Sequence, residues 1–269
     1  LLYTGSGSIP GLIGYTCLVL SGTTAIYFYK GWPKLLITSV AGGWIVLLIT
    51  LDKAVLGSAP YITGDLWALQ SGVIFAWLAF WAVPLLREVL TGNNAGNLSY
   101  KPAGRKNNPG LHVHMLTLST AVIGLALSMQ IWSLSDNTWG FICIMMASVY
   151  LVVSFALRLR TTLQNLAYTN ALVGVLLLTF AFNLLLEGDT LLFAIAAEGA
   201  VLHLIAHRLD ERSIVIVANI FFIVSGLMLG ERVLSSHSGE LPVLNAQALT
   251  DLWVVGLALG VTKLFDKYP

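Results

Sequence analysis

The stretch Ala171-Leu172-Val173-Gly174-Val175-Leu176-Leu177-Leu178-Thr179-Phe180-Ala181-Phe182 is apolar on every face of a helix. It lies inside a longer apolar run, residues 164–185. A helix needs about 20 mostly apolar residues to cross a bilayer, and this run is long enough. A membrane β-strand would instead alternate apolar and polar residues over about ten positions. The stretch therefore predicts a membrane-spanning helix.

The composition of the whole chain agrees with this interpretation. Of its 269 residues, 57% are hydrophobic and 10% are charged, and the mean hydropathy is +0.83. A soluble domain carries about 25% charged residues, so a soluble fold is excluded. Fourteen Lys and Arg residues against 13 Asp and Glu residues give a net charge of +1, which excludes nucleic acid as a partner bound through bulk charge.

Nine segments are long and apolar enough to span a bilayer, so we predict an all-α, polytopic transmembrane bundle of about nine helices. They are residues 10–28, 35–51, 66–86, 113–133, 139–157, 164–185, 190–206, 213–230 and 248–265. Most connections are short, which predicts antiparallel neighbours. A longer loop, residues 87–112, divides the chain into a three-helix segment at 1–86 and a six-helix segment at 113–269.

The basic residues predict the orientation of the bundle, because cytoplasmic loops carry an excess of Lys and Arg. Twelve of the 14 fall in alternate connections: Lys30, Lys34, Arg87, Lys101, Arg105, Lys106, Arg158, Arg160, Arg208, Arg212, Lys263 and Lys267. Only Lys53 and Arg232 fall on the other side. We expect an N-terminus outside, a C-terminus in the cytoplasm, and a location in a bacterial cytoplasmic (inner) membrane.

Two hairpins in the six-helix segment resemble each other. Each has an acidic outer turn, a helix, a basic inner turn and a second helix that contains an asparagine, Asn170 in one and Asn219 in the other. The two asparagines are 49 residues apart. This pattern predicts a parallel hairpin repeat of about 50 residues, although acidic outer turns and basic inner turns are common in any polytopic protein.

Two regions of the chain carry distinctive motifs. The first combines Leu1-Leu2-Tyr3-Thr4-Gly5-Ser6-Gly7-Ser8 with Tyr29-Lys30-Gly31-Trp32-Pro33-Lys34. The second combines Ala197-Glu198-Gly199-Ala200 with the basic exit Ala206-His207-Arg208-Leu209. In both regions the chain resembles the DUF2339 family of membrane proteins. The resemblance implies that the chain is a C-terminal portion of a longer membrane protein, and it supplies no catalytic residues.

Glu198 is the one acidic residue deep within an apolar segment, and such a residue usually faces the interior of a bundle or a cavity. Counted from the inner turn, Glu198 lies roughly 13–15 Å deep, and Asn170 and Asn219 lie roughly 10–13 Å deep. The three form a candidate intramembrane polar site. The alternative is a hydrogen bond between helices that only stabilises the bundle.

Two further features are candidates for binding or packing. His203 and His112 are weak candidates for a haem or pigment ligand, and a hydrogen-bonded core histidine is the simpler interpretation. Gly226-Leu-Met-Leu-Gly230 and Gly256-Leu-Ala-Leu-Gly260 are two GxxxG motifs, a spacing that lets helix backbones approach closely. We expect these four glycines to pack the eighth segment against the ninth, or to form a homo-oligomer interface.

Three functions stay open on this basis. The first is a structural or accessory subunit that contacts lipids and other membrane subunits. The second is a transporter or flippase-like protein that uses the polar layer around Glu198. The third is a pigment- or haem-binding subunit. A membrane enzyme is disfavoured because the polar groups are too sparse to build a catalytic site, and no motif calls for a metal or another cofactor.

Overall fold

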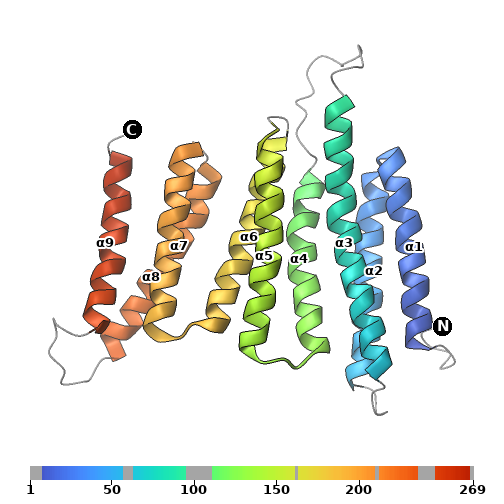
Figure 1. The fold of residues 1–269 in the computed structure, drawn as a ribbon, viewed down its shortest axis with the longest axis horizontal. Coiled ribbons are helices and arrows are strands. Elements are labelled where there is room, and N and C mark those ends of the chain that lie inside the picture. The colour runs from blue at the N-terminus through green and yellow to red at the C-terminus, as the bar shows by residue number, and fades with distance from the viewer. Residues whose placement is uncertain are drawn as a thin grey trace. The chain divides into compact units, whose positions relative to one another are not determined.

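The computed structural model describes residues 8–56, 63–94, 111–160, 163–209, 212–235 and 246–266. These residues form nine α-helices (Figure 1), which confirms the predicted all-α fold. The helices are α1 Ile9–Lys30, α2 Pro33–Leu56, α3 Thr63–Asn94, α4 Leu111–Ile131, α5 Asp136–Arg158, α6 Gln164–Leu185, α7 Gly188–Leu209, α8 Arg212–Ser235 and α9 Ala246–Asp266.

Six of the described helices, α1 to α6, are long and apolar enough to cross a membrane. Shorter apolar stretches occupy Ala218–Glu231 in α8 and Ala248–Val261 in α9. Helix α7 is continuous, but the ionisable residues Glu198 and His203 interrupt its apolar sequence. The chain is thus a multi-pass membrane protein by the length and composition of its helices.

Helices extend into both ends of the segment predicted as a loop, residues 87–112. Helix α3 continues to Asn94, and α4 begins at Leu111, while residues 95–110 lie outside the described part of the chain. The extension of α3 begins Arg87-Glu88-Val89-Leu90, in which Arg, Glu and Leu are good helix formers. Pro84 lies inside α3 without ending it, and membrane helices commonly tolerate an internal proline.

The helices group into two compact units whose boundary differs from the predicted division into three and six helices. One unit comprises residues 1–135 and 145–176, and the other comprises residues 136–144 and 177–269. Helix α4 belongs with α1 to α3, because it packs against α3 and α2. Helices α5 and α6 each contribute to both units. The 50-residue hairpin repeat stays a prediction.

The core of the first unit follows from helical periodicity. Buried residues recur at intervals of seven on α1, where they are Ile13, Leu20 and Tyr27, and at intervals of three or four on α2 and α3. This spacing places them on one face of each helix. Gly72 and Gly43 let the helices approach, since a Cβ at Gly72 would lie 2.8 Å from Ile13 Cγ2 and one at Gly43 would lie 3.1 Å from the Leu20 and Phe80 side chains.

The second unit is arranged around α7. Helix α7 packs against α8 and against α9, and α8 and α9 contact each other only slightly. Buried Leu192 and Ala196 on α7 meet Val254 on α9, and Met228 and Leu229 of α8 pack against the same cluster. Helix α7 is therefore the shared neighbour of α8 and α9.

We predict that Gly72→Ala destabilises the first unit, whereas Gly42→Ala stabilises it. Alanine gains about 0.5–1 kcal/mol over glycine within a helix. At Gly42 the added Cβ would meet no atom within 4 Å, so only this gain remains. At Gly72 the contact with Ile13 adds an overpacking cost of about 1–3 kcal/mol. The free energy of unfolding in detergent, followed by circular dichroism, measures both effects, and a gain in stability for Gly72→Ala would contradict the packing.

Candidate functional site

Glu198 is buried at the midpoint of α7, with 9% of its surface exposed. The Thr179 hydroxyl of α6 donates a hydrogen bond of 2.8 Å to Glu198 Oε2. The other carboxyl oxygen, Oε1, is buried and has no hydrogen-bond partner in the described part of the chain. One carboxyl oxygen is thus hydrogen-bonded to a neighbouring helix, and the other has no hydrogen-bond partner among the described residues.

His203 lies on the same helix, and both of its ring nitrogens have a partner. Nδ1 is 3.0 Å from the Gly199 carbonyl oxygen, and Nε2 is 3.1 Å from Asn219 Oδ1 on α8. A backbone carbonyl can only accept, so Nδ1 carries a hydrogen. Phe222 of α8 packs beside the ring, at 5.2 Å between ring centroids. His203 therefore joins α7 to α8 as a hydrogen-bonded core residue.

Asn170 belongs to a polar and aromatic cluster in the first unit. Its amide oxygen accepts a hydrogen bond of 3.0 Å from Trp81 Nε1 on α3, and its amide nitrogen donates to the Leu166 carbonyl at 2.8 Å. Trp77 stacks on Trp81 and donates a hydrogen bond of 2.9 Å to the Tyr150 hydroxyl of α5. Asn170 and Tyr150 are fully buried. The cluster thereby holds α5 and α6 against α3.

The three residues of the predicted polar layer thus occupy three separate hydrogen-bonded pairs. Glu198 pairs with Thr179 and Asn219 pairs with His203 in the second unit, while Asn170 pairs with Trp81 in the first. Each of the three residues thus has its own hydrogen-bond partner, although Glu198 Oε1 has none among the described residues. A single layer that joins all three remains a prediction.

The four glycines of the GxxxG motifs face open space. A Cβ added at Gly226, Gly230, Gly256 or Gly260 would meet no atom within 4 Å among the residues described. Packing of α8 against α9 through these glycines, or of one copy against another, stays a prediction. Large apolar side chains beside them are also exposed, including Leu227 and Leu259.

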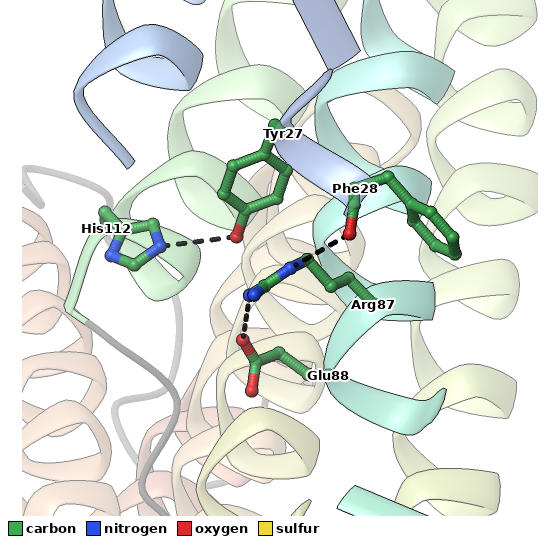
Figure 2. A network of polar contacts seen from close by, with 5 residues as sticks. All are labelled: Tyr27, Phe28, Arg87, Glu88 and His112. Carbon is green, nitrogen blue, oxygen red and sulfur yellow. Dashed lines mark hydrogen bonds and ion pairs between the residues drawn. The ribbon is translucent and has the colours of Figure 1, made fainter. Parts of the chain in front are cut away.

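A second polar network lies at one end of the first unit, where α1, α3 and α4 meet (Figure 2). Arg87 Nε of α3 donates to the Phe28 carbonyl of α1 at 3.2 Å, and the guanidinium lies 3.6 Å from the Glu88 carboxylate. The same guanidinium lies 5.2 Å from the centre of the Tyr27 ring. His112 Nε2 of α4 lies 3.4 Å from the Tyr27 hydroxyl. His112 is thus used to join α4 to α1.

Comparison with known proteins agrees with the fold. Residues 1–267 match a family described as "Predicted membrane protein (DUF2339)". The chain belongs to the DUF2339 family. No curated protein and no solved structure matches it.

Four side chains that form hydrogen bonds between helices in this DUF2339 chain could not be identified from the sequence. Each lies within an apolar run and looks like an ordinary member of it; the four are Thr179, Trp77, Trp81 and Tyr150. Their spacing gave a weak signal, because Trp77 and Trp81 are four residues apart and therefore share one face of α3. Inside a bilayer, the indole N–H of a tryptophan on that face needs a hydrogen-bond acceptor. For Trp81 the acceptor is the side-chain oxygen of Asn170.

Gly31 provides a test of the Arg87 network in the DUF2339 chain. Gly31 follows α1 in the left-handed conformation, at φ 70°, and a Cβ there would overlap the Arg87 guanidinium and lie 2.8 Å from Arg87 Cζ. Gly31→Ala should cost about 1–2 kcal/mol for the backbone conformation, plus the displacement of Arg87. Gly188→Ala is the control, because Gly188 has φ 56° and open space around it.

The free energy of unfolding should thus fall more for Gly31→Ala than for Gly188→Ala. The difference should disappear when Gly31→Ala is made in an Arg87→Ala background. Equal losses at the two glycines, with Arg87 present, would show that the guanidinium does not occupy this position.

Proposed function

We propose that this DUF2339 chain is a structural or accessory subunit of a larger membrane assembly. The observation that carries the proposal is the pair of outward glycine faces on α8 and α9. Gly226 and Gly230 share one face of α8, and Gly256 and Gly260 share one face of α9, because residues four apart lie one above the other on a helix. A Cβ at any of them would meet no described atom within 4 Å.

Lipid tails are as apolar as leucine, so helices associate in a bilayer through close packing rather than through the hydrophobic effect. A glycine face allows such packing, and a lipid gains nothing from it. The occupant that suits both faces is therefore another transmembrane helix, from a second membrane subunit or a second copy of the chain. The remaining surface contacts lipid.

We place the subunit in a bacterial cytoplasmic membrane with its N-terminus outside. Support comes from the end of the first unit at which Arg87 bonds to Phe28 and Arg160 donates to the Val89 carbonyl at 3.5 Å. Lys30 ends α1 next to Phe28. Basic residues from separate connections thus gather at one end, which is the arrangement that the positive-inside rule associates with the cytoplasmic side.

The subunit proposal predicts that bulky residues at the glycine faces release the chain from its complex. Gly226→Leu combined with Gly256→Leu should reduce the size of the particle extracted in mild detergent, measured by size-exclusion chromatography with light scattering. Gly42→Leu is the matched control, because Gly42 is also exposed with open space around it but has no GxxxG partner. A complex that survives the double substitution, or a wild-type chain extracted as a monomer, would contradict the proposal.

A second candidate function is transport or lipid translocation through the polar site around Glu198. The buried and unsatisfied Glu198 Oε1 favours it, because ionisable residues within membrane helices commonly mark substrate or ion pathways. By contrast, both ring nitrogens of His203 and Nε2 of His112 are engaged with protein groups. A pigment or haem would have to break those hydrogen bonds, so the geometry gives the third function less support.

Transport predicts that water reaches Thr179. With Cys17 and Cys143 replaced by serine, Thr179→Cys should react with a charged, membrane-impermeant thiol reagent added to one side of sealed vesicles. Ala181→Cys is the control, since Ala181 lies on the same helix and is fully buried. Equal protection of both cysteines from both sides would exclude a water-filled pathway at Glu198.

A further inference from the structure

Glu198 has one carboxyl oxygen without a hydrogen-bond partner among the described residues. The carboxyl group sits between α6 and α7, and Thr179 bonds to only one of its oxygens. The structure gives Glu198 no ion-pair partner among the residues it describes. The nearest titratable group along α7, His203, is engaged with Gly199 and Asn219.

The helices packed around Glu198 do not offer a compensating charge at its depth. Helix α6 contains no Asp, Glu, Lys or Arg. On α8 and α9 the charged residues lie toward the helix ends, and they are Arg212, Glu231, Arg232, Asp251, Lys263 and Asp266. A carboxylate anion at the midpoint of α7 would therefore be a buried charge with a single hydrogen bond, which is the costly arrangement for an ionisable group in a membrane.

We propose that Glu198 is a proton-binding site inside the membrane, where the carboxyl group is held neutral between α6 and α7. Binding a proton at Oε1 removes the net charge and leaves the hydrogen bond from Thr179 to Oε2 intact. A neutral carboxyl with one unsatisfied polar atom costs far less in an apolar medium than an uncompensated ion.

The geometry selects a proton over a metal cation. Calcium takes six to eight oxygen ligands and magnesium takes six, whereas this site supplies one carboxyl group and one hydroxyl. The described residues contain no group of three His, Cys, Asp or Glu side chains that could hold a metal ion. A proton needs only the unsatisfied oxygen.

This inference is independent of the subunit role and of transport, because a carboxyl can hold a proton with or without a water-filled pathway. The test is infrared spectroscopy of the purified chain at neutral pH, in which a neutral carboxyl gives a carbonyl stretch separate from the carboxylate bands. Glu198→Gln should remove this band, and Glu231→Gln, at an exposed position near the end of α8, should leave it unchanged.

A second variant keeps the test decisive if Glu198→Gln does not fold. Thr179→Val retains the carboxyl but removes its hydrogen-bond donor, so the band should persist at a shifted frequency. A neutral-carboxyl band that is absent from the wild-type chain, or one that neither Glu198→Gln nor Thr179→Val changes, would overturn the proposal. In that case Glu198 is ionised, and the subunit role stands or falls on the association measurement alone.

Discussion

A polar group inside hydrocarbon must find its partner within the protein, because no water is present to satisfy it. This constraint explains the contacts that join the helices of the chain. Trp81 meets Asn170, Glu198 meets Thr179, and His203 meets Asn219, and each bond links two different helices. Many serine and threonine hydroxyls instead donate to the carbonyl one turn back on their own helix, as Thr50 does to Val46 at 2.7 Å, whereas Ser154 of α5 donates to the Ala167 carbonyl of α6.

The same constraint separates two kinds of surface. At Gly72 and Gly43, side chains of neighbouring helices occupy the space where a Cβ would lie, so the helices of the first unit pack closely there. Where glycines face outward, as on α8 and α9, the packing surface has no occupant within the described chain. The open glycine faces on α8 and α9 are the surfaces that we propose a partner helix covers.

Much of the fold was predictable from the sequence, because apolar runs of about 20 residues specify membrane helices by length alone. The extension of α3 to Asn94 was not, since a helix that leaves the apolar run has no hydrophobic signal. The sequence also supplied the depths of Glu198, Asn170 and Asn219 but not their partners. Depth follows from counting residues along a helix, whereas a partner depends on how neighbouring helices rotate and pack. For that reason depth alone groups Asn170 with Glu198, whereas the Asn170 side chain accepts its hydrogen bond from Trp81.

The most direct test of this account is a double-mutant cycle on the Trp81–Asn170 pair. Trp81→Phe and Asn170→Leu, made singly and together, give the coupling free energy of the pair from unfolding measurements in detergent or lipid. A hydrogen bond between membrane helices is typically worth about 0.6 kcal/mol, with values up to about 1.7 kcal/mol, and we predict a stabilising coupling in this range. A coupling of zero, with each single substitution destabilising on its own, would contradict the claim that such pairs hold the helices together.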